Sequence, residues 1–96
     1  MMEIVYTEAF ENWLKRLRDL RARVSILSRI ERIEDGNFGD HKSVGGGVSE
    51  LRVNVGQGYR VYYTVRRATV VVLLCGGTKS SQRGDIGRAQ RIAREV

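Results

Sequence analysis

The segment from Val48 to Cys75 carries the clearest pattern of apolar and polar positions in the chain. Its runs are rich in β-branched and aromatic residues, and the first two alternate between apolar and polar side chains. Short gaps that contain Gly or Arg separate the runs, so the pattern predicts a meander of three consecutive antiparallel strands. The expected strands run from Val48 to Val55, from Tyr59 to Arg66 and from Thr69 to Cys75.

The predicted meander has one apolar and one polar face, because side chains alternate along a strand. The apolar face carries Leu51, Val53, Val55, Val61 and Tyr63, and the opposite face carries Glu50, Arg52, Asn54, Arg60, Tyr62 and Thr64. The third run is apolar on both faces, which is typical of a strand inside a sheet.

The first third of the chain predicts a strand followed by two helices. Met2 to Tyr6 is a short apolar run, expected beside the meander. Thr7 fits the N-cap of one helix, and Asp19 fits the cap of another that runs from about Leu20 to Asp35. Apolar residues recur at helical spacing in both: Phe10, Trp13, Leu14, Leu17 and Leu20, then Val24, Ile26, Leu27, Ile30 and Ile33. Two adjacent amphipathic helices predict a hairpin that covers the apolar face of the sheet.

Two glycine-rich segments flank the meander. Asn37 to Gly47 is predicted to be one long mobile loop that holds His41 and Lys42. Its triple glycine is not a P-loop, because no Lys-Ser/Thr follows and the next element is a strand. Residues 76–85 are predicted to form a polar turn, and Ile86, Ala89, Ile92 and Ala93 then trace the thin apolar stripe of a predicted short C-terminal helix.

The length indicates a single domain spanning residues 1–96, and the order of the predicted strands and helices indicates the α+β class. The proportions of apolar and charged residues are those of an ordinary globular protein. No apolar run approaches the length of a membrane span. One cysteine excludes an internal disulfide and favours a cytoplasmic location, and one Cys with one His cannot form a structural zinc site.

The net charge of +6 is unevenly distributed. Residues 1–40 contain seven basic and eight acidic side chains, whereas residues 41–96 contain ten basic and three acidic ones. This asymmetry favours a polyanionic partner or an acidic protein partner over an idle basic surface.

Three motifs resemble those of a known family. The strand GVSELR, the strand GQGYRVYY and the exit GGTKSSQRGDI occur in the order and spacing of the RelE/HigB-type toxins of bacterial type II toxin–antitoxin pairs. More narrowly, the chain is similar to the branch called addiction module killer proteins, and the resemblance covers essentially its whole length. It implies a RelE-like fold, in which a curved antiparallel sheet packs on a two-helix hairpin. It also implies metal-independent, cofactor-free cleavage of mRNA, usually on the ribosome, and a cognate antitoxin expected to be a DNA-binding helix-turn-helix protein.

The resemblance also suggests roles for individual side chains. Arg60 matches the arginine of the family's YR-x-x-Y strand and is expected to stabilise the phosphate in the transition state, since a guanidinium suits a phosphate. Lys79 lies where related toxins place basic or catalytic groups and is expected to bind phosphate or donate a proton. Further RNA contacts are expected from Arg52, Lys42, Gln82, Arg83 and Tyr62. Simple alternatives are an ion pair of Arg60 with Glu50 and a packing role for Tyr62.

The proton-transfer groups are not determined by the sequence. Some relatives place His or Tyr in the C-terminal segment, but this chain has neither after Tyr63. Glu50 and His41 are candidates by residue type alone. Two other functions remain open: a ParE-like toxin that acts on a protein such as DNA gyrase, and a basic nucleic-acid-binding module without toxicity.

Overall fold

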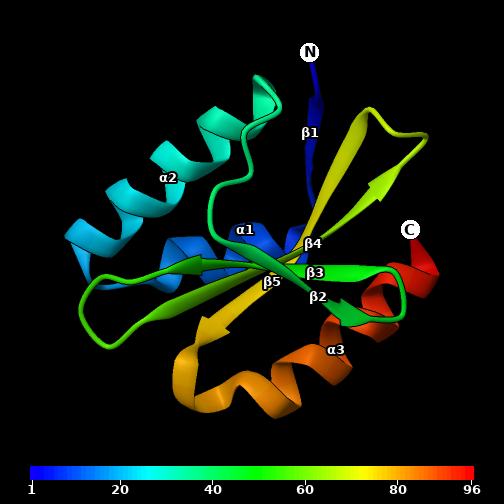
Figure 1. Cartoon of the computed structure of the whole chain (residues 1–96). Coiled ribbons are helices and arrows are strands. Elements are labelled where there is room, and N and C mark those ends of the chain that lie inside the picture. Colours follow the sequence, from blue (N-terminus) through cyan, green and yellow to red (C-terminus); the bar gives the residue numbers. More distant parts are fainter.

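The computed structural model describes all residues, 1–96, as one mixed five-stranded sheet with helices on both faces (Figure 1). The elements in chain order are β1 (Glu3–Tyr6), α1 (Glu8–Arg16), α2 (Leu20–Glu34), β2 (His41–Gly45), β3 (Val48–Val53), β4 (Tyr59–Arg66), β5 (Val70–Thr78), the short 3₁₀ helix η1 (Lys79–Ser81) and α3 (Gln82–Glu95).

The sheet has the strand order β1-β5-β4-β3-β2. The predicted meander is present, since β3, β4 and β5 pair antiparallel in sequence. The expectation of a purely antiparallel sheet is wrong, because β1 pairs parallel to β5, with Glu3 opposite Val70. The two helices between β1 and the meander carry the chain back across the sheet, which allows this parallel pairing.

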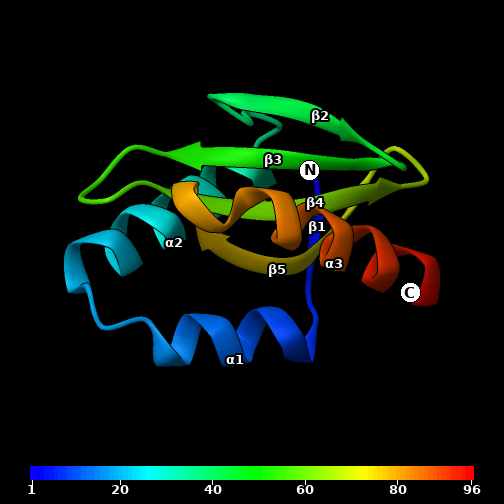
Figure 2. The ribbon, with the colours of Figure 1, turned by 90° about the horizontal axis from the view of Figure 1, so that it is seen from below.

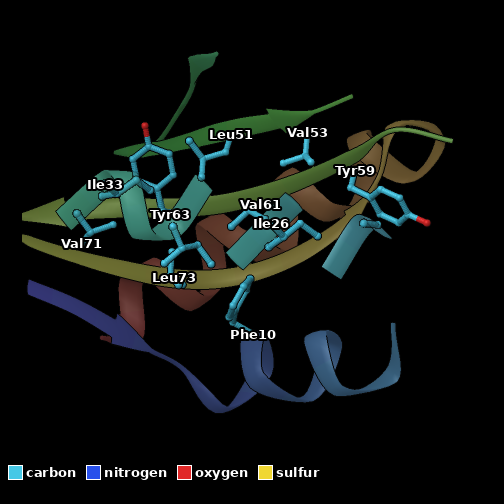
Figure 3. Packing of buried hydrophobic residues seen from close by; sticks show 12 residues of the cluster. Phe10, Ile26, Ile33, Leu51, Val53, Tyr59, Val61, Tyr63, Val71 and Leu73 are labelled. Atoms are coloured by element: carbon cyan, nitrogen blue, oxygen red, sulfur yellow. The ribbon is translucent and has the colours of Figure 1, made fainter. Parts of the chain in front are cut away.

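Helices α1 and α2 cover one face of the sheet, as the amphipathic pattern predicts. Thr7 and Asp19 cap them, with side-chain oxygens that accept from the backbone N–H of Phe10 and Ala22. Phe10 reaches from α1 toward Leu73 and Ile26 (Figure 3). The buried residues of this core are Phe10, Ala22, Ile26, Ile30, Ile33, Leu51, Val53, Tyr59, Val61, Tyr63, Val71 and Leu73.

Residues 76–85 are not one turn, because β5 extends to Thr78 and α3 begins at Gln82, and α3 is 14 residues long and not short as expected. Helix α3 covers part of the other face, and in Figure 2 it lies in front of the sheet. Its thin stripe, centred on Ala89 and Ala93, packs on a second buried cluster that includes Val48, Tyr62 and Leu74. The face that the alternation pattern marks as polar is therefore partly enclosed.

The segment expected to be one long loop contains a strand. β2 pairs antiparallel with β3 at the edge of the sheet, with Lys42 opposite Glu50. The turn between them is Gly46-Gly47, and both glycines have positive φ values of 64° and 77°. Tight hairpin turns of the type I′ class require positive φ at both central residues, which glycine adopts without steric cost.

The predicted apolar stripes of the two helices also need correction. Helix α1 ends at Arg16, so Leu20 belongs to α2, and its side chain is exposed. Val24 and Leu27 are exposed as well, so only part of the apolar surface of α2 faces the sheet. No helix in the structure combines the length and the apolar character that crossing a bilayer requires.

Candidate nucleic-acid interface

Two arginines meet side by side on the face of the sheet opposite α1 and α2. Arg52 on β3 and Arg60 on β4 are direct partners in the β3–β4 register. Like charges that lie directly opposite each other on neighbouring strands repel. The pair is therefore stable only with a counter-charge, and Glu50 supplies it.

Glu50 lies at the centre of the site and its side chain is fully buried. Arg52 donates from Nε to Glu50 Oε2 over 2.8 Å, and Arg60 Nε lies 3.7 Å from the same oxygen. Gln82, the first residue of α3, donates from Nε2 to Glu50 Oε1 over 2.7 Å. We call these four residues the Glu50 cluster; it carries two positive charges and one negative charge.

Arg60 is the most enclosed cation of the cluster, with 8% of its side chain exposed. One terminal nitrogen donates to the backbone carbonyl of Tyr59 over 3.2 Å, but the buried Nε has no hydrogen-bond partner. A buried donor without an acceptor is rare in folded proteins and marks a place that an additional acceptor would satisfy. Arg52 is more accessible, with 32% of its side chain exposed, and its hydrogen bond with Glu50 raises the pKa of its guanidinium.

The turn from β5 into α3 positions Gln82 over the cluster. Gly77 pairs with Arg60, and a Cβ at Gly77 would overlap the Asp85 carboxylate. Ser81 donates to Asp85 and its oxygen accepts from the Thr78 backbone N–H, which fixes the first turn of α3 against the sheet. Sequence reasoning missed this Ser81–Asp85 pair. The polar run after two glycines was the available signal for it.

Three further predicted cations lie around the cluster. Lys79 is exposed at the start of η1, and its backbone N–H donates to the Gly58 carbonyl, which places it beside the start of β4. Arg83 is exposed on the first turn of α3. Lys42 is exposed on β2 and shares the register row of Glu50, because paired residues of antiparallel strands point to the same face. Lys42 therefore comes from an edge strand and not from a mobile loop.

Tyr62 and His41 lie apart from this surface. Tyr62 is on the correct face but fully buried beneath α3, so its ring offers no surface to a base. Its hydroxyl has no hydrogen-bond partner, and burial, followed by the nearby Glu50 charge, raises its pKa. His41 pairs with Leu51, which places it on the opposite face, where its ring lies beside Phe38.

The geometry gathers several cations on one surface and leaves little free acid–base chemistry beside them. Both oxygens of Glu50 already accept hydrogen bonds, and His41 faces away from the cluster. The exposed cations Lys79, Arg83 and Lys42, together with the partly exposed Arg52, suit the phosphates of a nucleic acid.

Comparison with known proteins gives three findings. Residues 12–95 match the family described as Phage derived protein Gp49-like (DUF891). A protein of Haemophilus influenzae that is described as uncharacterized is 48% identical over 95 residues, which cover 99% of this chain and 96% of that protein. The solved structure of a mutant E. coli toxin RelE in the free state matches with a TM-score of 0.71 and 18% identity, over 95% of this chain and 97% of the other. This likeness confirms the α+β RelE-like fold, with a mixed sheet in place of the antiparallel one expected.

Proposed function

The chain belongs to the Gp49-like family of phage-derived proteins (DUF891), and from its RelE-like fold and the cations in and around the Glu50 cluster we propose that it is a toxin of a type II toxin–antitoxin pair. In this proposal it belongs to the HigB/RelE-like addiction module killer branch and cleaves mRNA on the ribosome, which inhibits translation in the cytoplasm. A cognate antitoxin, a DNA-binding helix-turn-helix protein, neutralises it.

The Glu50 cluster is the observation that supports this proposal most. Metal-free cleavage of RNA requires attack of a 2′-OH on the adjacent phosphate, and the extra negative charge that develops must be stabilised. Arg60 Nε forms an ion pair with Glu50 at 3.7 Å but has no hydrogen-bond partner, and Arg52 is partly exposed, so a phosphate oxygen at the cluster would meet two cations. Glu50 holds both guanidinium groups in place before the substrate arrives, which is the preorganisation that transition-state stabilisation needs.

Lys79 and Arg83 extend the cationic surface beyond the cluster. Both are exposed at the junction of η1 and α3. We assign them to the RNA backbone, with Lys42 on the far side of Glu50. An ammonium group is also a proton donor, so Lys79 is the candidate that protonates the departing 5′-oxygen.

The general base is assigned to the substrate complex and not to this chain. His41 faces the other side of the sheet and Glu50 has both oxygens occupied. Because His41 is out of reach and Glu50 is already engaged, a group of the RNA or the ribosome accepts the 2′-OH proton. The proposal therefore includes ribosome dependence, with weak or no cleavage of naked RNA.

The lack of a free proton-accepting group beside the cluster is also compatible with a second function. A toxin that blocks a protein target such as DNA gyrase, as ParE-like toxins do, needs no proton-transfer group at all. In that case the basic face binds an acidic protein surface, and substitution of Arg60 leaves toxicity largely intact.

Induced expression in a bacterial host separates the two functions. Cells producing the chain are followed for growth, and primer extension on an abundant mRNA maps new 5′ ends. Growth arrest with new 5′ ends within translated codons supports the nuclease. Arrest without new ends, together with DNA damage signalling, supports the protein target and overturns the nuclease.

A further inference from the structure

The outer surface of α2 carries an apolar stripe that no other part of the chain covers. Leu20, Val24 and Leu27 lie four and three residues apart, so they share one side of the helix. Their exposed fractions are 69%, 67% and 40%, whereas Ile26 and Ile30 on the inner side are buried in the core. Three large apolar side chains in line on one helix form a contiguous exposed patch, which is characteristic of a binding surface.

The stripe borders two shallow hollows. One, of about 330 Å³, lies between α2 and the end of β3, with Val24, Ser28, Val53 and Val55 in its lining. The other, of about 360 Å³, lies along the start of α2 beside Leu20 and Val24. Both hollows include Val24, so the stripe and the hollows form one surface, which we call the α2 groove.

The charges around the α2 groove have a single dominant sign. Between Lys15 and Arg32 the chain has seven basic side chains and two acidic ones, Asp19 and Glu31. The Asp19 carboxylate is engaged as the cap of α2. The linings of the two hollows include Arg21, Arg29 and Arg32 and contain no acidic residue. The stripe also begins at the N-terminus of α2, where the helix dipole is positive.

We propose that the α2 groove binds an acidic amphipathic helix of a partner protein. Helices that dock in grooves present apolar residues at positions i, i+3 or i+4, and i+7, which matches the spacing of Leu20, Val24 and Leu27. Acidic residues beside that stripe would meet the arginines of the groove. A second copy of this chain fits poorly because its groove carries the same positive charge, and RNA has no apolar side chains to cover the stripe.

The α2 groove lies on the face of the sheet opposite the Glu50 cluster. Helix α2 packs on the core formed by Leu51 and Val61, whereas Glu50 bonds to Gln82 of α3 on the other side. A partner helix in the groove would therefore leave the cluster open unless another part of the partner reaches it. The inference rests on the proposed function only for the partner's role as antitoxin, and its test involves no RNA.

A displayed library of helices of about 18 residues tests this inference. The library fixes apolar residues at the docking positions and varies the flanking positions freely among Asp, Glu, Lys, Arg, Ser and Gln. Binders selected on the full-length chain are sequenced, and their affinities are measured for the wild type, Val24→Asp and Arg21→Glu. Val96→Asp serves as the matched control, because Val96 is an exposed valine at the C-terminus.

The expected binders are rich in Asp and Glu, and they lose about tenfold or more in affinity with Val24→Asp or Arg21→Glu, a difference of about 1.4 kcal/mol. Val96→Asp should leave their affinity unchanged. Selection of basic or uncharged helices, or of binders that are insensitive to Val24→Asp, would overturn the proposal. Sedimentation that shows a dimer of the wild type, abolished by Val24→Asp, would assign the groove to a second copy instead. These binding measurements do not depend on whether the chain cleaves RNA, so a chain without nuclease activity would give the same outcomes.

Discussion

At the scale of single residues, Glu50 determines the shape of the candidate site. It is the only acidic side chain among two arginines and a glutamine, and it is completely buried. A buried carboxylate with its ion pairs contributes little net stability, yet removal of one partner is costly because it leaves an uncompensated charge. Glu50 is thus better explained as a residue that positions Arg52 and Arg60 than as a general base.

Glu50→Ala should destabilise the chain by about 3 kcal/mol, because it leaves the enclosed Arg60 without a counter-charge beside Arg52. Urea unfolding followed by circular dichroism measures this loss. The matched control is Glu95→Ala, an exposed glutamate at the end of α3, which should change stability by less than about 0.5 kcal/mol. Equal stabilities for the two variants would show that the cluster does not hold its charges as described.

The buried thiol of Cys75 is expected to make the free energy of unfolding depend on pH in the alkaline range. Burial raises the pKa of its thiol from 9.0 to about 11. The folded state therefore keeps a proton that the unfolded state loses, so the contribution is complete below pH 9 and decreases as pH rises toward 11. Urea unfolding at about pH 8 and pH 10.5 should show the wild type losing roughly 2 kcal/mol more than Cys75→Ala between the two conditions. Parallel losses would contradict the burial of this thiol.

At the scale of elements, the paired glycines near the end of β5 allow helices to approach both faces of the sheet. A Cβ at Gly76 would overlap the Trp13 ring of α1, and a Cβ at Gly77 would overlap Asp85 of α3. Close packing therefore explains why the sequence motif GGTKSSQRGDI begins with two glycines. Close approach here brings Gln82 within reach of Glu50.

Gly76→Ala and Gly77→Ala should each destabilise the chain by about 1–3 kcal/mol, because overpacked side chains force their neighbours to shift. Gly84→Ala is the control with the opposite sign. Gly84 lies in α3 with open space where a Cβ would point, so alanine should stabilise the helix by about 0.5–1 kcal/mol. Thermal unfolding of the three variants measures these changes, and a stable Gly77→Ala variant would contradict the described turn.

Elements with strong local patterns were predictable from the sequence. Alternation gave the faces of β3 and β4, and Thr7 and Asp19 marked the starts of both helices. Strand β2 was missed because it is an exposed edge strand without alternating apolar residues, although the Gly46-Gly47 pair is a hairpin signal. The parallel pairing of β1 depends on contacts far apart in sequence, which a four-residue strand does not reveal.

The candidate site was predictable in its members but not in their exposure. Alternation correctly placed Arg52, Arg60 and Glu50 on one face. The register between β3 and β4 then places Arg52 directly opposite Arg60. The thin stripe of α3 gave no sign that this helix covers Tyr62, and alternation gave no sign that Arg60 is enclosed. Burial of a polar strand face is a tertiary effect, so sequence patterns alone overestimate how many cations are free.

At the scale of the whole molecule, the excess positive charge predicts RNA binding that weakens with salt. Each phosphate contact on single-stranded RNA contributes a slope of about −0.7 to log K against log salt. Substitution of both Lys79 and Arg83 by alanine should therefore make this negative slope shallower by about 1.4 in filter-binding titrations. Arg18→Ala, which removes an exposed arginine between α1 and α2, should leave the slope unchanged. An equal effect of both changes would indicate nonspecific attraction to the whole surface.

The central claim is that Arg60 stabilises the phosphate during cleavage of mRNA on the ribosome. The most direct measurement is the single-turnover rate of mRNA cleavage on programmed ribosomes for the wild type and Arg60→Ala, with circular dichroism to verify folding. Arg91→Ala, which removes an exposed arginine of α3, is the control. We predict that Arg60→Ala lowers the rate by about 10²–10³-fold, the range measured when one transition-state donor is removed, while the control is unaffected. Cleavage by a folded Arg60→Ala variant at the wild-type rate, or no cleavage by the wild type, would contradict the claim.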